Sequence, residues 1–307
     1  MNRGKGTPRG RAEALAPTEP PTTRIADFDS HRLFVIPLGI GNAFTKRFFN
    51  TSLLLIAEGR GVLVDCPSPL RRVLGDAEKK ARVALDIPDF DHLVLTHLHG
   101  DHCNGVEEFG FFKRFVHGNR PHSPPDLYAL PEVLESLWEH RLMASMGVLT
   151  TPGESAPAAQ RMGDYFRTHA WMPGRELSLC HDDRDAPAMT FRIRRTQHFL
   201  PCFGLVAEFN GIKLGYSCDT AFDPEHIAFL EDADLILHEC GPGAGHTPLK
   251  DLLALPPPIR RKMLLIHVPD NIEDLDSEIP VADEGAIYDV RIGRDPVTLR
   301  EAFTTGL

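Results

Sequence analysis

The chain has 307 residues, of which 42% are hydrophobic and 25% charged, and its formal net charge is −10. This length and composition are typical of one large α/β domain that buries a substantial core. The acidic balance argues against a surface for long nucleic acids, because affinity for a polyanion comes mainly from Lys and Arg, whereas a small anionic substrate at a cationic centre is compatible with it.

The N-terminal segment and the cysteines bear on where the protein works. Residues 1–26 carry Arg, Pro, Gly and Thr without an apolar run, so we expect a disordered tail there and one domain over 27–307. No stretch approaches the ~18 consecutive apolar residues of a membrane span, and the six Cys are scattered. We therefore expect a reduced, cytoplasmic protein with no membrane partner.

The first part of the domain alternates strands with one helix. An apolar run over 33–37 predicts a strand, and 52–57 with 62–65 predicts a β-hairpin. Charged residues with periodic Leu, Val and Ala predict an amphipathic helix over 69–85. The segment 92–96 predicts a short buried strand that ends at a group of polar residues, where α/β folds tend to place ligands.

A Pro- and His-rich segment over about 118–185 predicts an insertion that closes over a binding site or forms an interface. Its one clear helix signal begins at Pro131 and ends before Gly147. Further on, the pattern predicts strands and one short helix. The strands are expected at 189–194, 204–209, 212–216, 235–237 and 263–266, the helix at 249–255, and a hairpin turn at Asn210-Gly211.

Four polar side chains follow the strand over 92–96 within six residues: His97, His99, Asp101 and His102. Gly100 permits the tight turn that aims them at one volume. Neutral imidazoles with a carboxylate suit Zn²⁺ and also accept iron or manganese. We favour a metal site over the alternative of a His-rich surface loop.

The spacing His97-x-His99-x-Asp101-His102 resembles the HxHxDH signature of the metallo-β-lactamase superfamily. The resemblance implies a four-layer αβ/βα sandwich, here with an inserted helical segment, and two divalent metal ions. His97 and His99 are then expected to help bind the first ion, and Asp101 and His102 the second. Asp65, at the end of the predicted hairpin, is similar to an upstream Asp that supports the ligands in that superfamily.

Later strand ends supply one further candidate ligand each. These are His198 in Thr-Gln-His, Asp219 in Ser-Cys-Asp-Thr, and His267 in Leu-Leu-Ile-His. Each residue taken alone is equally explained as a capping or core polar residue. Their order along the chain matches the superfamily, and Asp219 is then the carboxylate expected to bridge both ions.

The residues around His198 resemble the ribonuclease Z and cyclic phosphodiesterase branch, whereas lactonases and thioesterases carry a Gly-His-Thr-Pro-Gly element. The pair His238-Glu239 is similar to a His-Glu element of that branch. The resemblance implies His238 as the candidate for proton delivery, with Glu239 as its orienter or only a structural partner. His246, in Gly-His-Thr-Pro, is a second candidate acid or only a helix N-terminal feature.

Only about twenty residues separate His198 from Asp219, which leaves no room for the tRNA-grasping arm of short ribonuclease Z enzymes. We therefore expect a phosphodiesterase for a small anionic substrate such as a cyclic nucleotide or cyclic phosphate. The metals would supply a bridging hydroxide as nucleophile, oriented by Asp101. Hydrolysis of a non-phosphate ester, lactone or thioester is an alternative, and a metal-bound redox or ligand sensor is another.

Two further expectations concern partners and aromatic residues. Homodimers are common in the superfamily, so a second copy of the chain is an expected partner. Trp138, Trp171 and Phe199 are candidates for stacking on a nucleobase, but core packing is the favoured interpretation.

Overall fold

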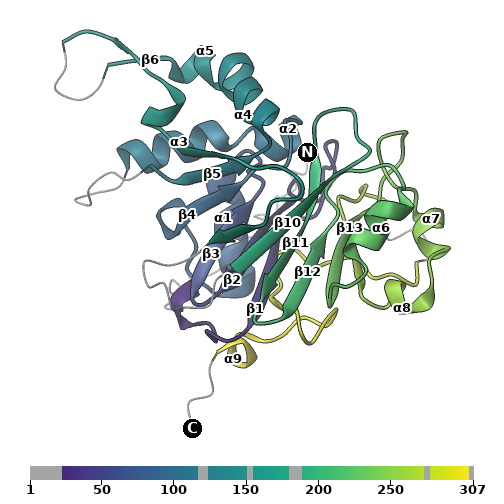
Figure 1. The fold of residues 1–307 in the computed structure, drawn as a ribbon. Coiled ribbons are helices and arrows are strands. Elements are labelled where there is room, and N and C mark those ends of the chain that lie inside the picture. The colour runs from purple at the N-terminus through teal and green to yellow at the C-terminus, as the bar shows by residue number, and fades with distance from the viewer. Residues whose placement is uncertain (1–22, 117–123, 151–154, 180–188, 273–276, 304–307) are drawn as a thin grey trace, which may run out of the picture.

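The computed structural model describes residues 23–116, 124–150, 155–179, 189–272 and 277–303. Two mixed sheets pack face to face, with helices on their outer sides (Figure 1). Figure 1 also shows α6, α7 and α8 outside one sheet and α3, α4 and α5 on the opposite side of the molecule. This arrangement confirms the predicted four-layer sandwich.

The seven-stranded sheet has the order β15-β1-β2-β3-β4-β5-β8. Its strands are β1 (Leu33–Gly39), β2 (Ser52–Ala57), β3 (Arg60–Val64), β4 (Phe90–Val94), β5 (Asp126–Ala129), β8 (Arg167–Ala170) and β15 (Tyr288–Asp289). Strands β2 and β3 form the predicted hairpin, and Glu58 and Gly59 make its turn with φ of 52° and 68°. Strands β3, β4, β5 and β8 are parallel, so their carboxyl ends lie along one edge.

The six-stranded sheet has the order β14-β13-β12-β11-β10-β9. Its strands are β9 (Leu177–Leu179), β10 (Met189–Arg195), β11 (Phe203–Phe209), β12 (Ile212–Tyr216), β13 (Leu235–Glu239) and β14 (Met263–Ile266). Asn210 and Gly211 have positive φ of 52° and 76° and make the predicted turn between β11 and β12. Because β12, β13 and β14 are parallel, the residues that follow them meet at one edge.

The helices are short, and several are single turns. They are η1 (Ile25–Asp27), α1 (Leu70–Ala81), η2 (Ile87–Asp89), α2 (Gly100–Cys103), α3 (Val106–Phe115), α4 (Pro131–Leu137), the π-helix η3 (Trp138–Leu142), α5 (Met143–Met146), η4 (Met162–Asp164), α6 (Pro224–Leu230), α7 (Leu249–Leu253), α8 (Pro257–Arg260) and α9 (Leu299–Ala302). Among the described residues, no helix has the length and apolar character needed to cross a membrane.

The segment predicted as an insertion, about 118–185, contributes strands to both sheets. Strands β5 and β8 extend the seven-stranded sheet, and β9 lies at the edge of the six-stranded one. The helices α4, η3 and α5 and the hairpin of β6 (Val148–Leu149) and β7 (Ala158–Ala159) project at the top of Figure 1. The sequence did not predict β5 and β8, because each has only four residues and neither shows a continuous apolar run: β5 reads Asp-Leu-Tyr-Ala and β8 reads Arg-Thr-His-Ala.

The predicted tail, 1–26, lies largely outside the described residues. Its last residues pack on the domain: the carbonyl oxygen of Thr23 accepts a hydrogen bond from the amide of Ala84 at 2.8 Å, and Ile25 is buried. Residues 23–26 of the predicted tail therefore contact the domain, and Ile25 provides an apolar contact that the composition of the tail did not suggest.

Candidate metal centre

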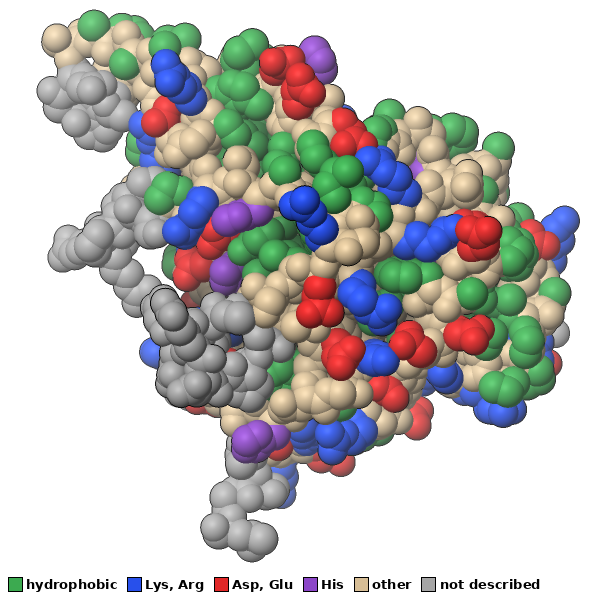
Figure 2. Space-filling view, viewed as in Figure 1, with side chains coloured by type: hydrophobic (Ala, Val, Ile, Leu, Met, Phe, Trp, Pro, Cys, Tyr) green, Lys and Arg blue, Asp and Glu red, His purple; other side chains and the backbone are tan. Residues whose placement is uncertain are grey.

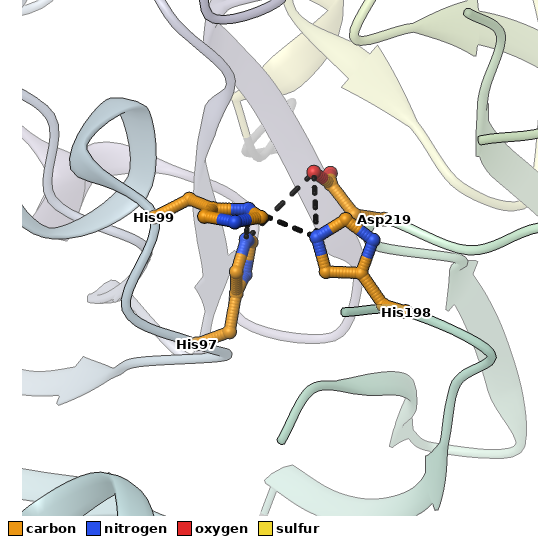
Figure 3. Close-up of side chains that lie close together, drawn as sticks. All are labelled: His97, His99, His198 and Asp219. Carbon is orange, nitrogen blue, oxygen red and sulfur yellow. Dashed lines mark hydrogen bonds and ion pairs between the residues drawn. The ribbon is translucent and has the colours of Figure 1, made fainter. Parts of the chain in front are cut away.

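Three histidines and one aspartate form a first cluster of ligand atoms (Figure 3). The Nδ1 atom of His99 lies 3.1 Å from Nε2 of His97 and 2.9 Å from Nε2 of His198. Oδ2 of Asp219 lies 3.7 Å from the Nε2 atoms of His97 and His198. The structure thus brings together ligands from the loop after β4, the loop after β10 and the end of β12.

A second cluster shares Asp219 with the first. Oδ2 of Asp101 lies 3.2 Å from Nε2 of His267 and 3.5 Å from Nε2 of His102. Oδ1 of Asp219 lies 3.3 Å from Nε2 of His102, and its Oδ2 lies 3.5 Å from Nε2 of His267. All seven candidate ligands therefore gather around one carboxylate, in the order that the sequence suggested.

Left-handed backbone turns the chain at three strand ends of this centre. Asp65 after β3, Cys218 after β12 and His267 after β14 have φ of 64°, 51° and 51°. Such angles are unfavourable for residues with a Cβ and persist where the surrounding structure demands them, often at functional sites. The sharp turns direct Asp65, Asp219 and His267 toward the common edge.

A buried network behind the ligands fixes the imidazole rings. Nδ1 of His102 donates to Oδ2 of Asp65 at 2.8 Å. The Thr96 hydroxyl contacts Oδ1 of Asp65 at 2.8 Å and Nδ1 of His97 at 3.1 Å. The Tyr216 hydroxyl donates to Oδ2 of Asp65 at 3.2 Å. Asp65 therefore supports the ligands as the sequence predicted, whereas the roles of Thr96 and Tyr216 had no sequence signal.

The donor set fits a cation between Asp219 and His102. When the His102 ring is neutral, its Nδ1 donates to the Asp65 carboxylate and its Nε2 carries a lone pair. That Nε2 faces Oδ1 of Asp219, and both atoms are buried without a hydrogen-bond partner in the described part of the chain. Two acceptors facing each other are stabilised by a positive ion between them.

The pKa shifts agree with a cation site. Burial lowers the pKa of His97, His99 and His198, so these rings are neutral and available as ligands. Burial also acts to lower the pKa of His102, but the charges of Asp219 and Asp65 outweigh it and raise that pKa well above its usual value. Carboxylates that stabilise a protonated ring also attract a metal ion.

An open cavity of about 570 Å³ lies beside the two clusters. Its lining includes candidate ligands from both clusters and residues from several loops of both sheets. These residues are Asn42, Ala43, Phe44, Asn50, Ser68, His99, Gly100, Asp101, Asn104, Phe199, Asp219, Gly241, Pro242, His246 and His267. The volume is in the usual range for a small-molecule site.

His246 is held at this cavity by Glu239. Oε1 of Glu239 lies 3.2 Å from Nδ1 of His246 and also accepts the amides of Thr220 and Thr247 at 2.9 Å and 3.2 Å. Burial raises the pKa of Glu239, and the two backbone hydrogen bonds act in the opposite direction. Because Nδ1 contacts Glu239, Nε2 is the ring nitrogen of His246 that can interact with a ligand in the cavity.

The structure does not bring His238 to the cavity, which corrects its predicted role in proton delivery. Its Nδ1 donates to the backbone oxygen of Glu239 at 2.8 Å, and burial lowers its pKa to about 4. Alternate residues of a strand face opposite sides of a sheet, so the side chain of Glu239 reaches the site and that of His238 does not. The side chain of Glu239 consequently contacts His246, whereas the sequence predicted that it would contact His238.

Several cavity residues escaped the sequence interpretation. Asn42, Phe44 and Asn50 belong to the loop between β1 and β2, where no motif marks them. Phe199 was expected to pack in the core, but 68% of it is exposed at the cavity, whereas Trp171 is buried as expected. The only sequence signal for Phe199 is its position next to the candidate ligand His198.

Known proteins resemble this chain in sequence and in fold. The family described as Anti-Pycsar protein Apyc1 matches residues 33–285. An Anti-Pycsar protein Apyc1 from Saccharibacillus brassicae is 30% identical over 265 residues, which cover 82% of this chain and 98% of the relative. The metallo-beta-lactamase fold protein YhfI from Bacillus subtilis matches with a TM-score of 0.61 at 19% identity, covering 84% of this chain and 99% of that one.

The short form of human tRNase Z gives a TM-score of 0.58 at 18% identity, covering 84% of this chain and 99% of that one. At these identities the two solved structures show the fold alone. The family match spans β1 to Gly285 and contains all seven candidate ligands. It confirms the prediction of a metal-dependent hydrolase with the metallo-β-lactamase fold. The chain belongs to the Anti-Pycsar Apyc1 family.

Proposed function

We propose that this chain hydrolyses a phosphodiester bond of a small cyclic nucleotide with two divalent metal ions, of which Zn²⁺ best suits the donor set. The observation that carries the proposal is the shared Asp219, which joins two ligand clusters beside a cavity that His246 also lines. Imidazole nitrogens and carboxylate oxygens in this combination are the usual ligands of catalytic zinc, and manganese or iron are the alternatives.

The size of the substrate follows from the chain between His198 and Asp219. That segment contains only the paired strands β11 and β12 with their connecting turns, so it has no arm that could grasp a large RNA. On the face drawn in Figure 2, basic and acidic side chains are interspersed, and the net charge of the chain is −10. Both features favour a small anion over a long polyanion.

When bound, two divalent ions supply a hydroxide at neutral pH and polarise the phosphoryl oxygen under attack. Asp101 lies at the cavity, where its carboxylate can orient the attacking water. His246 is the group that gives a proton from Nε2 to the leaving ester oxygen, while Glu239 holds its Nδ1 proton. The P–O bond to water forms as the ester P–O bond breaks, and the cyclic phosphate opens to a monoester.

The proposal extends to location and assembly. Five cysteines in the described residues, Cys66, Cys103, Cys202, Cys218 and Cys240, are free and buried, which suits a reducing compartment such as the cytoplasm. A homodimer and the domain limits 27–307 remain predictions from the sequence.

A substrate panel on protein of known metal content tests the proposal. It contains 2′,3′- and 3′,5′-cyclic nucleotides, bis(p-nitrophenyl) phosphate, a lactone and a thioester. We expect turnover of cyclic nucleotides with about two metal ions per chain. Turnover of the lactone or thioester alone would overturn the phosphodiesterase assignment, and bound redox-active metal without turnover of any substrate would favour the sensor alternative.

A further inference from the structure

Two large aromatic side chains stand exposed at the cavity. Phe44 is 91% exposed and Phe199 is 68% exposed, although both line the same cavity as Asp219 and His246. A buried aromatic ring removes roughly 150–250 Å² of surface from water. A ring that stays in solvent therefore does not add this hydrophobic contribution to the stability of the fold. Rings that remain exposed beside a site offer flat apolar surfaces to a ligand.

The ring of Phe199 is packed in one position. It lies on the backbone of Gly245: a Cβ atom added to Gly245 would come within 2.4 Å of Cε2 of Phe199. The carbonyl oxygen of Gly245 also accepts from Nδ1 of the ligand His198 at 3.0 Å, and the rings of His198 and Phe199 are 5.3 Å apart. One side of the Phe199 ring is therefore packed against the metal centre and the other faces solvent.

The loop that carries Phe44 is anchored to the segment that follows β14. Asp270 accepts the Thr45 hydroxyl at 2.5 Å and the Lys46 amide at 2.9 Å. The amide of Asn42 donates to the carbonyl oxygen of Val268 at 3.1 Å. Since Val268 and Asp270 directly follow the ligand His267, the position of Phe44 is coupled to the second ligand cluster.

We propose that Phe44 and Phe199 stack on the nucleobase of the substrate, with Asp270 as the positioning residue for Phe44. This inference rests on the proposed function, because it assumes that the phosphodiester lies at Asp219. Every nucleobase has a flat π-face, so stacking of this kind tolerates different bases. The site therefore prefers a nucleotide over the same cyclic phosphate without a base, and discriminates little among bases.

The test compares a 3′,5′-cyclic nucleotide with 1-O-methylribose 3′,5′-cyclic phosphate, which lacks the base. Phe44→Leu and Phe199→Leu remove the aromatic face and keep apolar bulk, and Phe44→Tyr restores the face. We expect each Leu variant to lower the ratio of kcat/KM for the two substrates about 10-fold, mainly through KM, and Phe44→Tyr to keep the ratio. Phe115→Leu, the same change at an exposed aromatic residue that does not line the cavity, is the matched control.

Equal losses on both substrates, or no loss on either, would overturn the stacking proposal while leaving the hydrolase intact. Binding of a nucleoside 5′-monophosphate and of ribose 5-phosphate, measured by calorimetry, makes the same comparison without turnover. If no phosphodiester is cleaved but the nucleoside monophosphate still binds about 10-fold tighter in a Phe44-dependent way, the proposed function fails and the stacking stands. If neither difference appears, the stacking is wrong.

Asp270→Asn tests the anchor. Its amide keeps one acceptor oxygen but loses the second, so the loop is held less firmly. We expect KM for the nucleotide to rise about threefold with kcat nearly constant, and the base-free substrate to respond less. Equal changes for both substrates would show that Asp270 acts only on the fold or on His267.

Discussion

Histidines lie on two sides of the six-stranded sheet, and their partners differ. On the inner side, in the loops that follow β13 and β14, His246 and His267 border the cavity, with Glu239 at 3.2 Å from His246 and Asp101 at 3.2 Å from His267. On the outer side, His226 on α6 and His238 on β13 are buried, and each contacts a backbone oxygen at 3.1 Å and 2.8 Å. Burial lowers the pKa of both outer histidines to about 4.

The difference shows how partners decide the role of a buried imidazole. A backbone carbonyl satisfies one nitrogen without adding a full charge, so the outer rings stay neutral and serve packing. Carboxylates add negative charge, and the inner rings then become metal ligands or proton carriers. Substitutions on the inner side should change chemistry, and those on the outer side should change stability.

The largest effect is expected at Asp219, which belongs to both clusters. Asp219→Asn removes the shared charge, so we expect less than one metal ion per chain and a loss of at least about 10³-fold in kcat/KM. Metal analysis and kinetics on the same sample check this. Asp232→Asn, at an exposed carboxylate near Lys213, is the control and should behave as wild type. Full metal content in Asp219→Asn would contradict the bridging role.

His246→Ala is expected to cost about 10²–10³-fold in kcat while both metal ions are retained, because it removes the proton carried to the leaving oxygen. A substrate whose leaving group is p-nitrophenolate needs this proton less and should lose less. Loss of metal in His246→Ala would instead make it a ligand, a reading that its place 5.2 Å from the ring of His267 permits.

Asp65→Asn tests the support behind the second cluster. It weakens the hydrogen bond that holds Nδ1 of His102 at 2.8 Å, and such substitutions commonly reduce metal affinity about 10–100-fold. Competition with a chelator measures the affinity directly. Thr96→Val removes the hydroxyl behind His97 but no charge, so we expect a smaller loss. Equal losses of metal affinity in the two variants would show that the charge of Asp65 adds nothing beyond the hydrogen bond that Thr96 also provides.

The two sides of the sheet also show which site residues could be predicted from the sequence and which could not. The candidate ligands His97, His99, Asp101 and His102 could be proposed because they are close in sequence and follow one strand. The other three candidates, His198, Asp219 and His267, could be proposed because each follows a later strand and their order matches the superfamily. The parallel strands β12, β13 and β14 then bring the residues that follow them to one edge.

The face of a side chain at the end of a strand was harder to predict. His238 and Glu239 are adjacent in sequence, so a motif does not say which of the two side chains points inward. A shift of the strand register by one residue would exchange their faces. The loop that carries Asn42, Phe44 and Asn50 is held through Thr45 and Lys46 by Asp270, which is far away in sequence. Short strands such as β5 and β8 gain their stability from neighbouring strands and leave little local pattern.

The smallest effect on activity is expected on the outer face. His238→Asn keeps a donor for the backbone oxygen of Glu239, so we expect kcat within about threefold of wild type. The contribution of His238 to the free energy of unfolding is expected to depend on pH. The folded pKa of His238 is about 4, below the usual value of 6.5, so between these limits the unfolded chain binds more protons than the folded one. Stability is therefore fully present above pH 6.5 and falls toward pH 4.

For this shift the loss is at most about 3 kcal/mol from His238, and His226 adds a similar amount. Urea unfolding in chelator, which removes the contribution of bound metal, should show a steeper acid decline in wild type than in His238→Asn. Identical slopes would mean that His238 is protonated in the folded protein or reaches solvent. In either case His238 would resemble His246 in exchanging protons with solvent. The inner and outer histidines would then differ only in where they lie.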